Sequence, residues 1–527
     1  MRTSQSHPLV IDAFDVASGK VGMTLCPGKH APSLSGPEWK RDLQADVTQL
    51  AIWKTAIVVS LTESDEMEKM NVANMGEALK RAGILWYHLP IPDTQAPDKD
   101  WYAAWRRISP ALHQSLEDGK RIVIHCKAGL ERTALVASLL LTERGESLSD
   151  AVRIVTKTRK GAGLMPVQRN YLAQLLDEGN REKQAMRACL FGGAIGDSLG
   201  AEIEFWSLDR ISGRFPNGID KLLPHQGKIG AITDDTQMTL FVAEGIVRAM
   251  VRGMSKGICH APSVVHHALL RWLETQGERG QVTNLCGVGL VSDPRLHARR
   301  APGMTCLSGL KASAHFGDKA SNQSKGCGTI MRVTPIGLSL RMHLDDLANN
   351  TSLYTHGHET GRVAAMAFAH IIADVLEGKS LDDSVRAALQ LELDPSTRQA
   401  ILKAVAMPTD GTPEQVERLG GGWVAEEALA IAIYAARCAR GFAHGLTIAV
   451  THSGDSDSTG AIAGNLLGLI YPTEVMAHPW RRQIECADLI NRAASDLFAA
   501  KYPDLDAERG SWDTKFVTDH AEFYPGW

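Results

Sequence analysis

Short apolar runs alternate with helical periodicity along the first third of the chain. Three of these runs are continuous, as expected of strands that are buried on both faces of a sheet. They are AIVVSL at 56–61, ILWYHLP at 84–90 and RIVIH at 121–125. Between and after them, apolar residues recur near the helical period, and each helical segment ends at a glycine. These segments lie at 66–83, 101–119 and 132–145. Strands that alternate with helices predict an α/β layer fold.

The pattern changes at DEGNREKQ, a polar and charged stretch at 177–184. Beyond it strand-like runs nearly vanish, and several segments with helical periodicity again end at glycine. Clear examples lie at 239–253, 263–277, 361–378 and 425–441. We therefore predict two domains, an α/β domain at 1–180 and an all-α domain at 185–527. The long connection at 282–325 contains glycine and serine, and we expect it to form a functional loop.

Composition adds few constraints on partners. The 527 residues are 44% hydrophobic and 22% charged, and 56 basic against 60 acidic residues give a net charge of -4. This balance does not indicate nucleic acid, although it does not exclude it, and no apolar run is long enough to span a membrane. The opening residues lack the apolar core of a secretory signal. Nine cysteines without paired spacing are typical of reduced thiols, so we expect a soluble cytoplasmic protein.

The first candidate site is the segment VIHCKAGLERTALVASLLL at 123–141, which predicts a strand, a loop and a helix. Backbone N–H groups and a helix N-terminus then surround one point, which makes an anion site. Arg132 adds a planar fork suited to phosphate oxygens, and this positive environment favours a thiolate at Cys126. We expect Thr133 to hydrogen-bond the sulfur and His125 to brace the loop. The alternative is a structural cysteine at the end of a buried strand.

The string H-C-x-x-G-x-x-R-T after an apolar strand resembles the cysteine-dependent protein tyrosine and dual-specificity phosphatases. GMTLCPGKH at 22–30 and RDLQADVTQL at 41–50 are similar to the cyclin-dependent-kinase-associated branch, so the resemblance covers about 1–180. It implies that Cys126 is the nucleophile of a phosphocysteine intermediate and that Arg132 holds the phosphate. It also implies a phosphate-binding loop made of Lys127, Ala128, Gly129, Leu130, Glu131 and Thr133.

Phosphoryl transfer to a thiolate needs an acid that protonates the leaving oxygen. In the family an aspartate on an upstream loop has this role, and HLPIPDTQAPD at 88–98 matches that loop. Asp93 is the first candidate and Asp98 the second. Either could instead be an ordinary turn aspartate beside proline.

The second candidate site combines two distant segments rich in oxygen side chains, ITDDTQMTL at 232–240 and THSGDSDSTGAIAGNLLG at 451–468. Such residues are good helix caps, and capping is the simpler interpretation of either segment alone. Pooled carboxylates repel one another unless cations neutralise them, so the two segments together predict a site for two divalent ions. The predicted ligands are Thr233, Asp234, Asp235, Asp455, Asp457 and Ser458.

Five blocks of sequence in this part resemble the ADP-ribosylglycohydrolase family and appear in family order. They are GGAIGDSLGAEIEF, TDDT, SKGCGTIMRVTPIGL, GGWVAEEALAIA and SGDSDSTGAIAGNLLG, and they cover about 185–470. The resemblance implies an orthogonal α-helical bundle that holds two Mg²⁺ or Mn²⁺ ions through the six ligands above. Family members often have threonine where Ser458 stands, and serine keeps the hydroxyl.

The same resemblance implies roles for residues near the metals. Glu204 would relay a proton during cleavage at the anomeric carbon, with Glu202 less favoured, while the metals act as Lewis acids. The loop at 321–332 would lie against the ADP-ribose phosphates, although many relatives have asparagine in place of Cys327. A histidine in THGHE at 355–359 would touch substrate, although an H-x-H pair is more often structural. The implied ADP-ribose-binding residues are Ser324, Gly326, Cys327, Gly328 and His356.

Together these sites predict a bifunctional hydrolase. One domain would remove ADP-ribose from an ADP-ribosylated protein or other substrate through an N- or O-glycosidic bond. The other would hydrolyse a phosphomonoester on a phosphorylated substrate. The alternative is that one domain is a non-catalytic reader of phosphate or ADP-ribose that targets the other.

Overall fold

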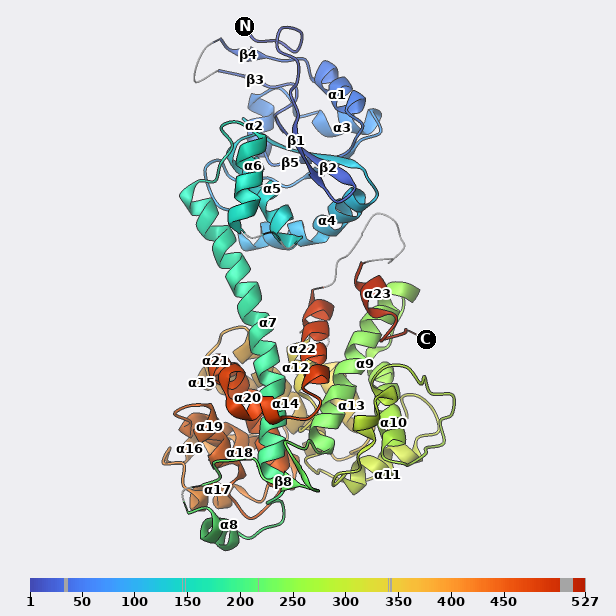
Figure 1. Cartoon of the computed structure of the whole chain (residues 1–527), viewed down its shortest axis with the longest axis vertical. Coiled ribbons are helices and arrows are strands. Elements are labelled where there is room, and N and C mark those ends of the chain that lie inside the picture. The colour runs from blue at the N-terminus through green and yellow to red at the C-terminus, as the bar shows by residue number, and fades with distance from the viewer. Residues whose placement is uncertain are drawn as a thin grey trace. The chain divides into compact units, whose positions relative to one another are not determined.

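The computed structural model describes residues 1–32, 37–144, 146, 148–216, 218–339, 341, 344–502 and 515–526. The chain divides into two compact units after residue 179. This division falls within a long helix, α7 (Pro166–Gly200), and the polar stretch 177–184 is part of that helix rather than a loop. The two units are described separately below (Figure 1).

The first unit is built on a five-stranded sheet with the strand order β1-β2-β7-β5-β6. The strands are β1 (Asp12–Val16), β2 (Gly19–Leu25), β5 (Thr55–Ser60), β6 (Leu85–His88) and β7 (Arg121–Cys126). β1 is antiparallel to β2, and the other neighbouring strands are parallel. The three predicted strands are thus present, whereas the sequence did not predict β1 or β2. A small hairpin, β3 (His30–Ala31) and β4 (Trp39–Lys40), lies outside this sheet.

Helices cover both faces of this sheet. One apolar cluster joins the sheet to α4 (Lys99–Glu117), α5 (Glu131–Glu143) and α6 (Leu148–Thr158). A second joins the opposite face to α1 (Leu43–Ile52), α2 (Ser64–Lys69) and α3 (Met75–Arg81). The predicted α/β layer fold is therefore confirmed.

The single helix predicted at 66–83 is two helices, α2 and α3, with a turn between them. Asn71 lies in this turn at φ +59°, a left-handed conformation that asparagine tolerates better than most residues. The carbonyl of Met70 accepts a hydrogen bond from His30 N at 3.0 Å. The periodicity continues across the turn because Met67, Met70, Val72 and Met75 all face the same core.

Within its described residues, the second unit has only helices as regular structure apart from a short hairpin, β8 (Pro224–His225) and β9 (Lys228–Ile229). Its core contains four long helices, α9 (Asp234–Lys256), α14 (Glu359–Leu376), α18 (Ala425–Cys438) and α20 (Ser456–Ile470). α10 (Ala261–Thr275) packs on α9, and α19 (Phe442–Val450) packs on α20. The predicted helical class is confirmed.

Further helices complete this unit. The connection predicted at 282–325 carries the short helices η1 (Leu290–Ser292), η2 (Pro294–His297) and α11 (Met304–Ala312), so it is not a structureless loop. The others are α8 (Leu208–Arg214), α12 (Thr334–Leu338), α13 (Leu344–Leu353), α15 (Leu381–Ala388), α16 (Pro395–Ala406), α17 (Pro413–Leu419), α21 (Pro472–Ala477), η4 (Pro479–Gln483), α22 (Ala487–Lys501) and α23 (Lys515–His520).

The C-terminal half of α7 lies against α20 at a stripe of glycines on both helices. A methyl group built on Gly196 would lie 1.9 Å from the carbonyl oxygen of Gly460, and one on Gly200 would lie 2.1 Å from Ser456 O. One on Gly464 would lie 2.1 Å from Gly192 O. The two backbones are therefore in direct contact, with no room for a side chain between them. This contact sets the distance between the residues that follow Gly196 and those at the start of α20.

Across the described ranges, no helix combines the length and apolarity that crossing a membrane requires.

We expect Gly196→Ala to destabilise the second unit by about 1–3 kcal/mol, because the new methyl group forces α7 away from α20. Differential scanning calorimetry would show this as a lower melting temperature. Gly213→Ala in α8 is the matched control, since a Cβ there meets nothing within 4 Å. That change should leave stability unaltered or raise it by up to about 1 kcal/mol. Equal melting temperatures for Gly196→Ala and the native chain would contradict a tight helix contact.

Candidate active sites

The segment around Cys126 forms the predicted strand, loop and helix. Cys126 is the last residue of β7, and α5 begins five residues later at Glu131. The backbone N–H of Gly129 donates to the Cys126 sulfur at 3.3 Å. Gly129 has φ +71°, and a Cβ there would lie 2.1 Å from Thr24 O, so this position requires glycine. The loop therefore turns the Gly129 N–H toward the sulfur, as an anion cradle does.

Arg132, in the first turn of α5, reaches the same region and is held by carboxylates. Its guanidinium donates to both oxygens of Glu66, at 2.5 and 3.0 Å, and to Ile91 O at 2.9 Å. The Asp93 carboxylate lies 2.9 Å from Arg132 Nη2. Two acidic groups thus fix the orientation of a buried guanidinium. Glu66 was not among the predicted residues, because only the fold brings α2 next to α5.

The two candidate acids have different environments. Asp93 contacts Arg132 and has a side chain that is 52% exposed, so a substrate can reach it. Asp98 caps α4 by accepting a hydrogen bond from Trp101 N at 2.7 Å. Asp98 is therefore engaged in helix capping, whereas Asp93 stays accessible beside Arg132.

His125 precedes the loop and Thr133 follows it, and their contacts are as follows. His125 Nε2 lies 2.6 Å from Ser60 Oγ, and Ser60 Oγ accepts from Trp86 Nε1 at 2.8 Å, so this imidazole links β7 to β5 and, through Ser60, to β6. Burial lowers the pKa of His125 to about 4, which keeps the ring neutral. The bond expected from Thr133 to the sulfur does not form, because Thr133 Oγ1 is buried without a hydrogen-bond partner.

The outward carbonyls of the loop are fixed by a cation that the sequence did not reveal. Arg159, just after α6, donates from Nε to Gly129 O at 2.6 Å and from Nη2 to Ala128 O at 3.2 Å. Because these carbonyls point away toward Arg159, the N–H groups are left to face the cradle. Lys127 is partly exposed, Leu130 precedes α5, and Glu131 is its first residue.

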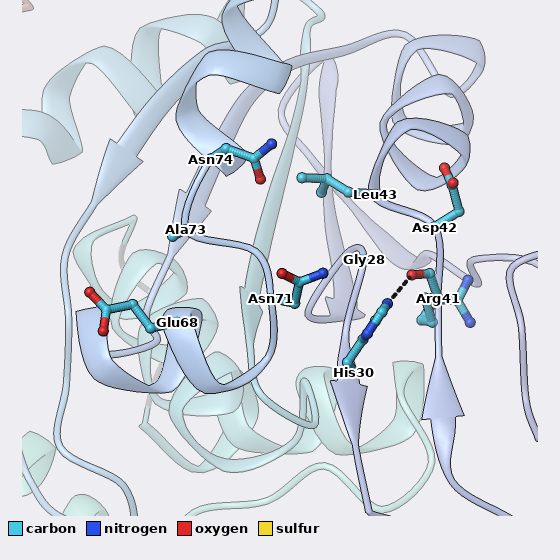
Figure 2. Close-up of a pocket in the computed structure, with 9 residues that line it drawn as sticks. All are labelled: Gly28, His30, Arg41, Asp42, Leu43, Glu68, Asn71, Ala73 and Asn74. Carbon is cyan, nitrogen blue, oxygen red and sulfur yellow. Dashed lines mark hydrogen bonds between the residues drawn. The ribbon is translucent and has the colours of Figure 1, made fainter.

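A separate cavity of about 600 Å³ lies on the first unit. Figure 2 shows its lining, with His30 Nε2 placed 2.9 Å from Arg41 O. Its lining residues are Gly28, His30, Arg41, Asp42, Leu43, Glu68, Asn71, Ala73 and Asn74. None of the predicted phosphatase residues lines it, and we assign it no chemistry.

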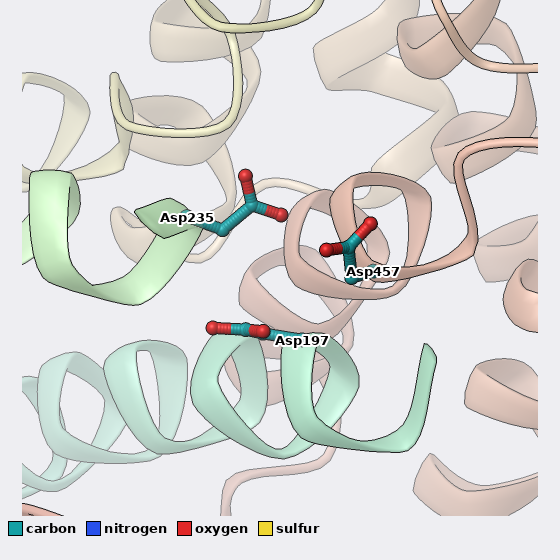
Figure 3. Close-up of side chains that lie close together, drawn as sticks. All are labelled: Asp197, Asp235 and Asp457. Atoms are coloured by element: carbon teal, nitrogen blue, oxygen red, sulfur yellow. The ribbon is translucent and has the colours of Figure 1, made fainter. Parts of the chain in front are cut away.

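In the second unit, carboxylates from three distant segments converge. One oxygen each of Asp197, Asp235 and Asp457 lies within 4.8 Å of the other two, and Figure 3 shows them on α7, α9 and α20. A second triad with the same spacing combines Glu204, Asp455 and Asp457. Asp457 belongs to both triads and therefore lies at the centre of the cluster.

Helix starts place these side chains, so capping and clustering occur together. Thr233 caps α9 by accepting from Asp235 N at 3.3 Å, and Asp455 caps α20 by accepting from Ser458 N at 3.2 Å. Ser458 Oγ then donates to Asp235 Oδ1 at 3.2 Å, which joins the two helix starts. The capping interpretation is therefore correct for two residues without displacing the predicted cluster.

Asp197 is the member that the sequence reasoning missed. Its carboxylate accepts from the backbone N–H groups of Thr233, at 3.0 Å, and Thr236, at 3.2 Å, and from the Thr236 hydroxyl. It thereby fixes the start of α9 against α7. The only signal in the sequence is an aspartate inside the otherwise apolar and glycine-rich segment GGAIGDSLG.

The electrostatics of the cluster favour a bound cation. Burial raises the pKa of Glu204 to about 8, and neighbouring carboxylates, Asp455 first, add to the shift. Burial likewise raises the pKa of Asp234 to about 8 and that of Asp197 to about 6. Asp235 Oδ2 is buried without a hydrogen-bond partner. Hard oxygen donors with this much mutual repulsion fit divalent cations such as Mg²⁺ or Mn²⁺.

The cluster forms one wall of a cleft of about 340 Å³. Its lining includes many of the predicted residues: Glu204, Asp234, Asp235, Gly326, Cys327, Gly328, His356, Asp455, Asp457 and Ser458. Thr233 and Ser324 are not part of this lining; Ser324 Oγ instead accepts from Gly326 N at 3.3 Å within the loop.

The two histidines of THGHE have different roles. Burial lowers the pKa of His356 to about 3, and its Nδ1 lies 2.8 Å from Thr355 Oγ1. A Cβ on Gly326 would lie 3.2 Å from His356 Nε2, so this neutral ring faces the loop. His358 caps α14 by accepting from Thr360 N at 3.1 Å. The H-x-H pair is therefore not a shared metal site.

An aromatic pair at the cleft was also missed. Phe205 and Trp423 stack with ring centroids 5.0 Å apart and an interplanar angle of 27°. Both line the cleft, yet Phe205 is 72% and Trp423 41% exposed. Exposed stacked rings at a cleft are suited to contact a planar or apolar group of a ligand.

Comparisons with known proteins agree with this division of the chain. The N-terminal part, residues 19–154, matches the family described as Cyclin-dependent kinase inhibitor 3. The protein of that name from Sus scrofa is 29% identical over 150 residues, which are 28% of this chain and 69% of the relative.

The second unit matches a different family and different relatives. ADP-ribosylarginine hydrolase Tri1 of Pseudomonas putida is 25% identical over 61% of this chain and 80% of its own. ADP-ribosyl-[dinitrogen reductase] glycohydrolase of Rhodospirillum rubrum is 22% identical over 56% of this chain and 88% of its own. The family described as ADP-ribosylglycohydrolase matches residues 178–506, which is more than half of the sequence. The chain therefore belongs to the ADP-ribosylglycohydrolase family and carries an N-terminal unit related to the cyclin-dependent-kinase-associated phosphatases.

Proposed function

We propose that the protein is a bifunctional hydrolase with two chemically independent sites. The second unit releases ADP-ribose from an ADP-ribosylated substrate, and the first hydrolyses a phosphomonoester. The observation that carries the first part is the convergence of Asp197, Asp235 and Asp457 beside a cleft, with Asp235 Oδ2 buried and unpartnered. The names of the two bacterial relatives support an ADP-ribosylated protein as the substrate class. A cytoplasmic location, where thiols such as Cys126 stay reduced, belongs to the same proposal.

Two divalent ions would be held by residues from the starts of α9 and α20. When bound, Mg²⁺ or Mn²⁺ supplies Lewis-acid stabilisation and a template for substrate oxygens. The holding residues we propose are Thr233, Asp234, Asp235, Asp455, Asp457 and Ser458, with Asp197 positioned to bind or to orient the others.

Glu204 is the residue that we assign to proton transfer at the glycosidic bond. It is only partly buried and lines the cleft, so its carboxyl can reach substrate. Burial raises its pKa to about 8, and the neighbouring carboxylates add to the shift, so the group titrates near neutral pH. Glu202 is less suited to this role, because its carboxylate lies 3.5 Å from His225 Nδ1 and outside both triads.

The cleft also has the features required for a nucleotide diphosphate. The loop residues Gly326 and Gly328 lack side chains, and a Cβ on Gly328 would lie 2.7 Å from Cys306 Sγ. Packing against the protein thus requires glycine at 328, and both glycines line the cleft, where their backbone is available to a ligand. We propose that this loop, with His356, contacts ADP-ribose.

In the first unit, Cys126 Sγ attacks phosphorus while the bond from phosphorus to the leaving oxygen breaks. Asp93 donates a proton to that oxygen, and Arg132 with the loop N–H groups holds the three remaining phosphate oxygens. Water then hydrolyses the phosphocysteine, with Asp93 accepting its proton. Glu66 and Arg159 act as positioning residues, because they hold Arg132 and the loop.

We expect Cys126→Ser to abolish hydrolysis of an aryl phosphate, because the nucleophile is lost. Binding of a phosphate analogue such as vanadate or tungstate should stay measurable, since Arg132 and the N–H groups remain. Steady-state kinetics and calorimetry check the two parts. The matched control is Cys259→Ser, a half-buried thiol of the second unit, which should keep phosphatase turnover. Full phosphatase activity in Cys126→Ser would exclude the thiolate mechanism.

We expect Glu204→Gln to lower single-turnover release of ADP-ribose by about 10²–10⁴-fold in Mg²⁺, while ADP-ribose binding by calorimetry changes little. Glutamine keeps the shape but cannot accept the proton. The matched control is Glu202→Gln, which should retain turnover. ADP-ribosyl-arginine and ADP-ribosyl-serine peptides serve as substrates, with a chelator as the metal-free reference.

Four results would contradict this assignment. Unchanged turnover in Glu204→Gln would move the proton relay elsewhere, and loss in Glu202→Gln alone would move it to Glu202. Loss of Mg²⁺ binding in Glu204→Gln would make Glu204 a metal ligand instead. Absence of ADP-ribose release by the native protein from every substrate would favour a reader over an enzyme.

A further inference from the structure

The thiol of Cys327 lies among the oxygen side chains of the proposed metal centre. Its Sγ is 2.9 Å from Asp455 Oδ2 and 3.6 Å from Ser458 Oγ. The backbone N–H of Cys327 donates to Trp423 O at 3.1 Å, which fixes the loop and therefore the direction of the side chain. Sulfur is a soft ligand, whereas every other side chain proposed for this centre offers oxygen.

A second observation shows that the space beside this sulfur is built for a ligand. Asp235 is 2% exposed, and its Oδ2 has no hydrogen-bond partner. Its other oxygen accepts from Ser458 Oγ, the same hydroxyl that neighbours the thiol. Cys327, Asp235 and Ser458 all line the cleft, so an ion that enters it meets both sulfur and oxygen.

We propose that Cys327 gives the metal centre a sulfur ligand and allows it to bind thiophilic divalent ions such as Zn²⁺, Cd²⁺ and Co²⁺. The inference rests on the metal centre of the proposed function and adds to it a residue that sets metal preference. On binding, the S–H bond loses its proton to solvent and sulfur forms a bond to the ion. Asp455 Oδ2 loses its hydrogen bond from the thiol and is free to bind the same ion. Thiophilic ions then compete with Mg²⁺ for the centre.

The competing explanation is that the thiol only donates a hydrogen bond to Asp455 and never contacts the ion. Serine could replace cysteine in that role, because a hydroxyl donates to the same carboxylate. An asparagine amide could also donate to this carboxylate, but the only ligand atom that it offers to an ion is a carbonyl oxygen. Cys327→Ser and Cys327→Asn therefore separate a sulfur ligand from a hydrogen-bond donor.

Cobalt(II) is the probe, because a bond from sulfur to cobalt gives a charge-transfer absorption in the near ultraviolet that oxygen ligands do not give. The measurements use the full chain with Cys126→Ser, which removes the thiol of the other site. We expect one equivalent of Co²⁺ to produce the sulfur band in this protein and no band after Cys327→Ser or Cys327→Asn. The matched control is Cys306→Ser, the other thiol that lines the cleft, which should keep the band.

Calorimetry with Cd²⁺ and Mg²⁺ gives an independent measure. We expect Cys327→Ser to weaken Cd²⁺ binding by about 10–100-fold and to change Mg²⁺ binding much less. Absence of the band, its survival in Cys327→Ser, or equal Cd²⁺ affinity in both proteins would overturn the assignment. If the sulfur band is absent but Mg²⁺ binding and ADP-ribose release persist, only the assignment of Cys327 as a ligand is refuted. If the native site binds no divalent ion, the proposed metal centre is refuted as well.

Discussion

The direct backbone contact between α7 and α20 is the constraint on which the second unit depends. Gly196 and Gly460 lie so close that a single methyl group has no space between them. Asp197 follows Gly196, and Asp457 lies one turn from Gly460, so the glycines determine how near the two carboxylates come. The start of α9 is then fixed against Asp197 by hydrogen bonds from Thr233 and Thr236. Packing of small residues thus creates the acidic cluster.

That cluster is costly to fold without a counter-charge. Burial raises the pKa of its carboxyl groups, so ionising all of them together is unfavourable when no cation is present. A divalent ion would favour the ionised forms and offset their repulsion. A bound ion would therefore stabilise the helix starts that carry these carboxylates. In the phosphate cradle of the first unit, the buried charge is positive instead of negative. There Glu66 and Asp93 neutralise a buried arginine, and Arg159 holds the loop so that its N–H groups face an anion.

The sequence predicted what local patterns encode and missed what only the fold brings together. Continuous apolar runs identified β5, β6 and β7, whereas β1 and β2 carry glycine, lysine and aspartate among their apolar residues and gave no clear signal. The helical spacing of apolar residues did not reveal the turn at Asn71, because the apolar residues on both sides of the turn pack into the same core. Motifs located the candidate ligands at two helix starts. Asp197, Glu66 and Arg159 act across long sequence separations, and no local pattern distinguishes them from ordinary polar residues.

Asp457 belongs to both carboxylate triads, so its substitution directly tests whether the second unit holds a cation-dependent ADP-ribose site separate from the proposed phosphatase site. The measurement compares Asp457→Asn with the native chain for Mg²⁺ binding by calorimetry, ADP-ribose release and aryl phosphate hydrolysis. We expect Mg²⁺ binding to weaken, ADP-ribose release to be lost and phosphate hydrolysis to stay unchanged. Native rates of Mg²⁺-dependent ADP-ribose release in a folded Asp457→Asn protein would contradict it.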